Sequence, residues 1–274
     1  YIPVEKFELI SKYSGKEGVI PKINSLGSLE WKKNKQRIIN KVRDIADKLI
    51  KLYAMRSMQK GFAFSKDTKY HEEFYKQFPY QPTLDQLVSF ESIKKDMESQ
   101  TPMDRLLCGD VGFGKTEVAF RAMFKAVYDG KQVLYLCPTT ILSNQQYQNA
   151  LIRFKNFPVN IALLNRFTTP SKTKEIINSL KDGTVDIVIG THRLLSDDIK
   201  PKDLGLLVID EEQRFGVTHK EKIKQYKANV DVLTLTATPI PRTLQMSIIG
   251  IRSLSVIKTP PVNRYPVQTY VVYA

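Results

Sequence analysis

The stretch Leu106-Leu107-Cys108-Gly109-Asp110-Val111-Gly112-Phe113-Gly114-Lys115-Thr116 passes from an apolar run into a glycine-rich turn and then into Lys-Thr. Its spacing matches G-x-x-x-x-G-K-[ST], the phosphate-binding loop of nucleoside triphosphatases, at Gly109, Gly114, Lys115 and Thr116. Glycines let successive backbone N–H groups point at phosphate oxygens, and the following helix adds its positive end. Lys115 supplies a charge for the β- and γ-phosphates, and the Thr116 hydroxyl can ligate Mg²⁺. The whole loop from Gly109 to Thr116 is therefore predicted to hold ATP with Mg²⁺.

The segments around this loop alternate between apolar, strand-like runs and helical patterns. Strands are expected at residues 103–108, 132–137, 159–164, 185–189, 205–210 and 230–235, and helices at 67–78, 83–98, 117–128 and 141–154. Another helix should begin after Thr169, an N-cap followed by Pro170 at the first helical position. Nearly continuous Val/Ile/Leu runs are typical of parallel strands covered on both faces. The sequence thus predicts an α/β fold with right-handed crossovers and ligands at the carboxyl ends of the strands.

The part of the chain before this region has a different character. Residues 2–10 alternate like a strand and residues 18–27 have the composition of a loop, so a β-rich module is expected to end there. The helical pattern from residue 29 to about residue 60 contains no Gly or Pro and has one apolar stripe, formed by Ile38, Val42, Ile45, Leu49 and Leu52. Between residues 32 and 60 it carries ten Lys or Arg and two acids. The long basic helix either contacts another domain or a nucleic acid, or presents an ordinary solvated face.

The composition limits the classes of function. The net charge of +14 favours a polyanionic partner such as nucleic acid over a merely basic soluble protein. No apolar run reaches the roughly 18 residues of a membrane span, and no signal peptide is recognisable at the start. Cys108 and Cys137 lack metal-ligand spacing and are expected to be buried, reduced thiols. We therefore expect a cytoplasmic location. The missing initial Met and the strand-like end at residues 270–274 predict a piece of a longer protein.

Gln86 has two interpretations that the local sequence leaves open. Thr83 and Gln86 fit the capping box T-x-x-Q, in which each side chain satisfies the backbone N–H of the other. Alternatively, the Gln86 amide binds the Watson–Crick edge of adenine, with Phe78 beside the base.

Acidic residues follow the expected strand at 205–210. A phosphate-binding loop needs a carboxylate from a neighbouring strand to complete the Mg²⁺ site, and Asp210 stands where that strand ends. Glu211 is then placed to orient and deprotonate the attacking water. Gln213 extends the pattern to D-E-x-Q. The predicted Mg²⁺ ligands are Thr116 and Asp210, and the predicted catalytic residues are Lys115, Asp210, Glu211 and Gln213.

The pattern D-E-x-Q, followed by Thr236-Ala237-Thr238, resembles motifs II and III of the superfamily 2 helicases and translocases. Pro138-Thr139-Thr140 resembles motif Ia, and Gly190-Thr191-His192 resembles motif Ib. The resemblance implies a RecA-like lobe, an adenine-reading role for Gln86, and strand-end loops that bind the DNA backbone without reading bases. The residues assigned to DNA contact, or to its coupling with hydrolysis, are Pro138, Thr139, Thr140, Arg166, Thr191, His192, Thr236, Thr238 and Arg242. Taken singly, a Thr at a strand end or a lone His is usually structural.

Longer runs narrow the resemblance to the branch that contains RecG and the bacterial transcription-repair coupling factors. Both are double-stranded DNA translocases. The runs that carry this likeness are 103–116, DEEQRFG at 210–216 and TATPIPRT at 236–243. Three earlier runs, at 1–5, 26–31 and 44–54, are similar to the coupling factors in particular. A RecG-like fork-remodelling helicase is the alternative.

The resemblance to the coupling factors also implies a domain organisation and a role. Residues 1–27 would end an RNA-polymerase-interacting module, 28–62 would form a linking helix, 63–258 the first motor lobe with its Q-motif helices, and 259–274 the inter-lobe linker with the start of a second lobe. The role implied is a translocase that acts on stalled RNA polymerase and couples transcription to nucleotide excision repair. RNA polymerase and the repair protein UvrA would bind mainly through regions absent from this chain. An arginine finger from the second lobe would also be absent, so we expect very low ATPase activity from this chain alone.

Two other classes of protein remain. One is a non-catalytic binding module that uses a decayed nucleoside triphosphatase fold as a polymerase-docking scaffold. The intact Lys115, Thr116, Asp210 and Glu211 argue against it. The other is a metabolite kinase, which would not need Gln86, D-E-x-Q and Thr236-Ala237-Thr238 together.

Overall fold

The computed structural model describes residues 60–216, 219, 222–223, 226, 229–237 and 253–262, together with residues 33, 35–37 and 39–40, which are helical. The chain divides into two compact units, residues 1–50 and 51–274. The expected strand at 2–10, the rest of the linking helix and the start of a second lobe lie outside the described residues. So do Thr238 and Arg242. The second unit holds the predicted lobe.

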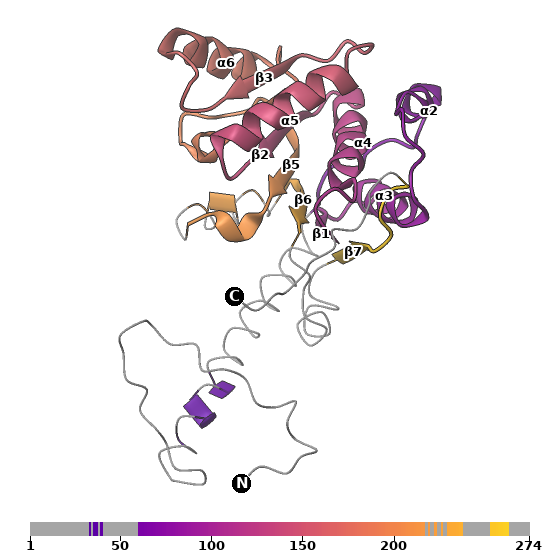
Figure 1. Ribbon diagram of the computed structural model, residues 1–274. Coiled ribbons are helices and arrows are strands. Elements are labelled where there is room, and N and C mark those ends of the chain that lie inside the picture. The colour runs from indigo at the N-terminus through magenta and orange to yellow at the C-terminus, as the bar shows by residue number, and fades with distance from the viewer. Residues whose placement is uncertain are drawn as a thin grey trace, which may run out of the picture. The chain divides into compact units, whose positions relative to one another are not determined.

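One sheet of seven strands forms the centre of this unit, and every strand pair is parallel (Figure 1). The strands are β1 (Asp104–Gly109), β2 (Gln132–Leu136), β3 (Ile161–Leu164), β4 (Ile187–Gly190), β5 (Leu204–Asp210), β6 (Asp231–Thr236) and β7 (Ser253–Ile257). Their order across the sheet is β3-β4-β2-β5-β6-β1-β7. The phosphate-loop strand β1 therefore lies one place from the edge, and β5, which carries Asp210, lies two strands away from it.

Helices cover both faces of the sheet, as expected. The helices are α2 (Lys69–Lys76), α3 (Leu84–Met97), α4 (Lys115–Tyr128), α5 (Thr140–Arg153) and α6 (Pro170–Asp182), with short 3₁₀ turns η2 (His192–Leu195) and η3 (Glu212–Arg214). Successive residues of a strand point to opposite faces. Leu206 and Val208 accordingly join the core shared with α2, α3, α4 and α5, whereas Leu207 and Ile209 join the core shared with α6 and η2. Both cores are built from the continuous apolar runs of the sequence.

The six expected strands are all present, with ends that shift by up to two residues, and the helix that begins at Pro170 has Thr169 as its N-cap. β7 was not expected. It lies at the edge of the sheet, where Ser253 is exposed and Leu254 and Val256 are half-buried, and its two serines interrupt the apolar run that is typical of the inner strands. Gly61 is non-helical, and its N–H donates to the Gln100 carbonyl at 2.7 Å, so it already belongs to the lobe.

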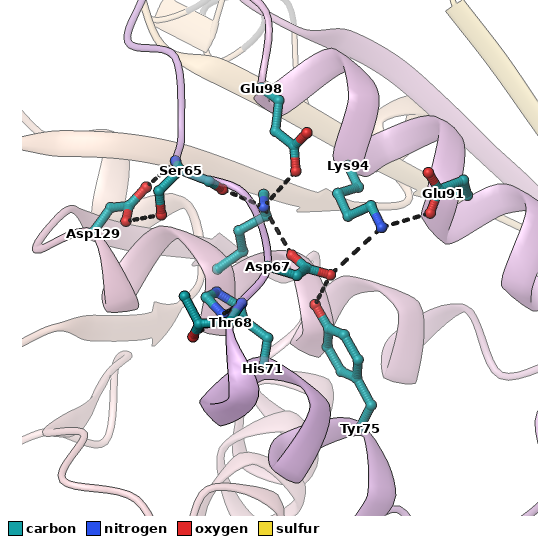
Figure 2. A network of polar contacts seen from close by, with 10 residues as sticks. Ser65, Asp67, Thr68, His71, Tyr75, Glu91, Lys94, Glu98 and Asp129 are labelled. Carbon is teal, nitrogen blue, oxygen red and sulfur yellow. Dashed lines mark hydrogen bonds and ion pairs between the residues drawn. The ribbon is translucent and has the colours of Figure 1, made fainter.

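A buried lysine of α4 fixes the segment at residues 60–68 to that helix. Figure 2 shows the polar network around it, with Ser65, Asp67, Glu98 and Asp129 labelled. Lys125 is fully buried, and its ammonium group donates to the Ser65 carbonyl at 2.6 Å, to Asp67 at 2.9 Å and to Glu98 at 2.8 Å. At the end of α4, Asp129 accepts from the backbone N–H of Ser65 at 2.6 Å and from its hydroxyl. The segment that enters the lobe is thus bound to the helix whose first turn carries Lys115.

No helix among the described residues is both long and apolar enough to cross a membrane. Cys108 and Cys137 are both buried thiols, as expected.

Candidate nucleotide-binding site

The glycine-rich loop joins the end of β1 to the start of α4. Gly112 and Gly114 adopt φ angles of 81° and 78°, in the left-handed region that glycine enters at little cost. The Lys115 ammonium group donates to the carbonyls of Gly109 at 2.6 Å and Asp110 at 2.9 Å, so it lies across the loop. A triphosphate is bound by inward-pointing backbone N–H groups, by the positive end of a helix and by a cation. The loop, the start of α4 and Lys115 provide these three.

Gly114 is also required for space. A Cβ at this position would collide with the amide nitrogen of Gln86, which lies against the loop. Gly130 makes a matched comparison because its φ of 72° is similar, while a Cβ there would meet nothing within 4 Å.

We expect Gly130→Ala to cost about 1–2 kcal/mol, the usual penalty of a left-handed residue with a side chain. Gly114→Ala should carry the same backbone penalty and also displace Gln86, so ATP binding should weaken by at least about tenfold, which corresponds to about 1.4 kcal/mol. Urea unfolding and titration with a fluorescent ATP analogue measure the two effects. Equal ATP affinity in the two variants would contradict this role of Gly114.

Two carboxylates at the end of β5, those of Asp210 and Glu211, act on the lysine. Burial lowers the pKa of Lys115, and the charges of Asp210 and Glu211 oppose that shift. Burial, reinforced by Glu211, raises the pKa of Asp210 to about 6, while Lys115 acts in the opposite direction. A bound cation beside Asp210 would add a second positive charge to that of Lys115. It would stabilise the ionised carboxylate and so lower its pKa.

Tyr135 lies near the two expected Mg²⁺ ligands, Thr116 and Asp210. Its side chain is fully buried at the end of β2, and burial, together with the charge of Asp210, raises its pKa well above the usual value. The Thr116 side chain acts on this pKa in the opposite direction. A hydroxyl and a carboxylate near the phosphate loop fit Mg²⁺, which is commonly held by one or two protein oxygens together with nucleotide phosphates.

Glu211 links the ends of two strands. Its backbone N–H donates to Leu235, and its carboxylate accepts from the Ala237 N–H at 2.7 Å, so the end of β5 is tied to the end of β6. The Gln213 amide also donates to this carboxylate. The structure therefore brings two of the predicted catalytic residues, Glu211 and Gln213, to the end of β6 that carries Ala237. The backbone of Glu211 has a φ of 53°.

Gln86 makes the predicted capping box and also reaches the phosphate loop. Its carbonyl oxygen accepts from the Thr83 N–H at 3.0 Å, and its own N–H donates to the Thr83 hydroxyl at 3.3 Å. The amide nitrogen donates to the Phe113 carbonyl at 2.9 Å. The capping interpretation is confirmed, and the same side chain ties α3 to the loop. Phe78, the other residue expected near the base, is partly buried, with its ring 5.5 Å from that of Tyr80 and within 6.0 Å of the Arg121 guanidinium.

The residues assigned to DNA contact follow other strand ends along the same edge of the sheet. Thr139 is the N-cap of α5, where its hydroxyl accepts from the Leu142 N–H at 3.2 Å, and it lies between Pro138 and Thr140. Cys137 donates to Gly190 at 2.7 Å, which places the expected motifs Ia and Ib side by side.

The exposure of these residues differs. Thr191 and Thr236 are buried, whereas His192 and Arg166 are exposed. The Arg166 guanidinium lies 4.9 Å from the centre of the Phe167 ring. An exposed residue can meet a DNA backbone directly, whereas a buried hydroxyl at a strand end can act on DNA only through its neighbours.

Sequence reasoning missed a buried ion cluster behind the loop. Glu117, in the first turn of α4, accepts from Arg121 at 2.9 Å and from Arg153 of α5 at 2.9 Å. It also missed Asp85 in the first turn of α3, which accepts three hydrogen bonds from residues 258 and 259. The only feature of the sequence that could have drawn attention to Asp85 is its position next to Gln86.

A phosphate loop with its lysine, facing a strand-end Asp-Glu pair on a parallel sheet, defines a nucleoside triphosphatase lobe of the RecA-like helicase type. The sequence pattern of the DEAD/DEAH box helicase family matches residues 83–247, and the chain belongs to this family.

The most informative similarities extend beyond that pattern. The chain is 65% identical over 272 residues to the transcription-repair-coupling factor of Bacillus subtilis (strain 168), and 57% identical to that of Staphylococcus aureus (strain USA300). Each alignment covers 99% of this chain and 23% of the relative, so the chain spans less than a quarter of their length. Among solved structures, RecG bound to a three-way DNA junction superposes with a TM-score of 0.69 and 35% identity, over 80% of this chain and 31% of that chain.

Proposed function

We propose that this chain is the first motor lobe of an ATP-dependent double-stranded DNA translocase that acts on stalled RNA polymerase and couples transcription to nucleotide excision repair. The observation that carries the proposal is the 65% identity to a transcription-repair-coupling factor over 99% of the chain, including the residues before the lobe. The likeness to RecG covers 80% of the chain, and it favours the second candidate, a fork-remodelling helicase.

In this proposal the carboxyl edge of the sheet divides into two parts. Around β1, β5 and α3, the loop from Gly109 to Thr116 holds the phosphates, Gln86 and Phe78 face the adenine, and Thr116 with Asp210 holds Mg²⁺. Bound Mg²⁺ would neutralise charge on the phosphates. The proposed catalytic residues are Lys115, Asp210, Glu211 and Gln213. Around β3, β4, β2 and β6, the remaining strand-end residues contact the DNA backbone or couple that contact to hydrolysis.

The proposal includes the organisation of the chain. Residues 1–27 end a polymerase-interacting module, 28–62 form the linking helix, 63–258 form the lobe, and 259–274 lead to a second lobe. RNA polymerase and UvrA are the proposed protein partners, mainly through regions outside this chain, and the proposed location is the cytoplasm. The net charge of +14 supports a nucleic-acid partner.

We expect this chain alone to hydrolyse ATP about 10³–10⁵ times more slowly than the full-length protein on DNA, because an arginine finger supplied by the second lobe contributes that factor in related systems. Steady-state phosphate release from both proteins, with and without double-stranded DNA, makes the comparison. Rapid hydrolysis by the isolated chain would contradict the assignment to one half of a two-lobe site.

The full-length protein should release a stalled RNA polymerase from DNA in an ATP-dependent reaction. Remodelling of forked DNA with no effect on a stalled polymerase would favour the RecG-like alternative. DNA binding should be independent of sequence and steeply salt-dependent, since each neutralised phosphate contributes a slope of about −0.9 to a plot of log affinity against log salt. Strongly sequence-selective binding would count against both candidates.

A further inference from the structure

Asp85 joins the first turn of α3 to the segment that leaves β7. One carboxylate oxygen, Oδ2, accepts from the Lys258 N–H at 2.9 Å, the Thr259 N–H at 2.8 Å and the Thr259 hydroxyl at 2.8 Å. Hydrogen bonds from Lys258 and Thr259 lower the pKa of Asp85, so the carboxylate is ionised at neutral pH. Charge-assisted hydrogen bonds of this kind are about twice as strong as neutral ones.

The same segment also contacts the phosphate side of the site. Ile257, the last residue of β7, pairs with Gly109, the first glycine of the loop. The approach is close, because a Cβ on Gly109 would lie 3.2 Å from that of Ile257. Residues 257–259 therefore lie between the start of the phosphate loop and the start of α3.

Gln86, the residue after Asp85, connects α3 back to the phosphate loop. Gln86 donates to the Phe113 carbonyl at 2.9 Å, near the other end of the loop. The loop, the first turn of α3 and the departing segment are thus connected in a ring, through Gln86, Asp85, Thr259, Ile257 and Gly109. The side-chain amide of Gln86 uses one N–H for Phe113 and one lone pair for Thr83, so a bound base would share Gln86 with these partners, and Asp85 lies in the same helical turn.

We propose that Asp85 is a positioning residue that transmits the response of α3 and the phosphate loop to nucleotide into the segment Lys258–Thr259. This inference rests on the proposed function, in which residues 259–274 lead to a second lobe. A carboxylate with three donors holds that segment to α3, so a shift of the helix moves the segment with it. The three hydrogen bonds of Asp85 join it to the departing segment rather than to the reacting groups, so its effect should appear in coupling rather than in chemistry.

A merely structural role for Asp85 would have a different outcome. In that case, replacing Asp85 would lower the free energy of unfolding. The ratio of the translocation rate to the hydrolysis rate would stay the same in the protein that remains folded. The discriminating quantity is therefore the distance moved along DNA per ATP hydrolysed.

The test uses the full-length protein with Asp85→Asn, which keeps the shape of the side chain and removes its charge. Displacement of a triplex-forming oligonucleotide reports translocation, and phosphate release reports hydrolysis. We expect the distance per ATP to fall about tenfold, the size of effect expected from losing a charge-assisted hydrogen bond. The maximal hydrolysis rate should change by less than about twofold, well below the tenfold fall expected in the distance per ATP.

Thr259 provides a second variant should Asp85→Asn fold poorly. Thr259→Val removes one of the three donors and should lower the same ratio, whereas Thr259→Ser keeps the hydroxyl and should preserve it. The matched control is Asp129→Asn, because Asp129 also accepts from a backbone N–H and a hydroxyl, those of Ser65, at the other end of α4 (Figure 2).

An unchanged ratio in folded Asp85→Asn and Thr259→Val proteins, or an equal fall in Asp129→Asn, would overturn the inference. Failure of the proposed function would look different, since the wild-type protein itself would then neither hydrolyse ATP on DNA nor displace the oligonucleotide.

Discussion

Replacement of Lys115 by alanine is expected to slow DNA-stimulated ATP hydrolysis by the full-length protein by a factor of about 10²–10³, the usual cost of removing one group that stabilises charge in a transition state. The Lys115 ammonium group lies across the loop between the carbonyls of Gly109 and Asp110, and it faces the acids at the end of β5. Its removal takes away the positive charge that this loop directs at a phosphate. The loss should appear both in the maximal rate and in the affinity for ATP.

Phosphate release over a range of ATP concentrations gives both quantities. Lys76→Ala is a suitable control, since Lys76 is exposed in the last turn of α2 and forms a surface pair with Glu72. Hydrolysis at the wild-type rate in Lys115→Ala would remove the central support for a nucleotide site in this loop. A parallel loss in Lys76→Ala would point to damage to the fold.

Lys125→Met is expected to destabilise the lobe by about 3–5 kcal/mol, the cost of removing one partner from a buried ion pair. Lys125 is fully buried between Asp67 and Glu98, whose side chains keep only 18% and 22% of their exposure (Figure 2). The apolar replacement has a similar length but leaves two carboxylates facing one another. The Ser65 carbonyl also loses its donor.

Urea unfolding of the chain measures this loss. Lys94→Met is the matched control, because Lys94 pairs with Asp67 at 3.5 Å and Glu91 at 2.7 Å but remains partly exposed, so it should cost no more than about 1 kcal/mol. Adding Glu98→Gln to Lys125→Met should recover part of the stability, since one unpaired charge disappears. Equal losses of stability in the two lysine variants would show that burial does not determine how much the Lys125 ion pairs stabilise the lobe.

Local patterns in the sequence predicted most of the sheet and the phosphate loop. The loop is recognisable because its glycines, Lys115 and Thr116 must stand at fixed spacing, and the buried strands because both faces are apolar. The capping box of Thr83 and Gln86 is equally local. Asp210 was placed correctly because a strand end is visible as the point where an apolar run meets acids.

Features that depend on distant residues could not be read in this way. Lys125 looks like any polar residue on a helix until Ser65, Asp67 and Glu98 surround it. Asp85 gains its partners from residues 258 and 259 at the other end of the lobe, and β7 is identified by its pairing with β1 rather than by its own composition. Such contacts depend on topology, which no local pattern contains.

The conformation of Glu211 has a consequence for the energy of the site. Within the residues that the structure describes, it is the only non-glycine residue with a positive φ, a conformation that costs on the order of 1–3 kcal/mol. The hydrogen bonds to Leu235 and from Ala237 hold it there. The lobe thus stores elastic energy in a single peptide at the end of β5, and a movement that breaks both contacts would let that peptide relax. That relaxation would lower the free energy needed to separate the end of β5 from the end of β6.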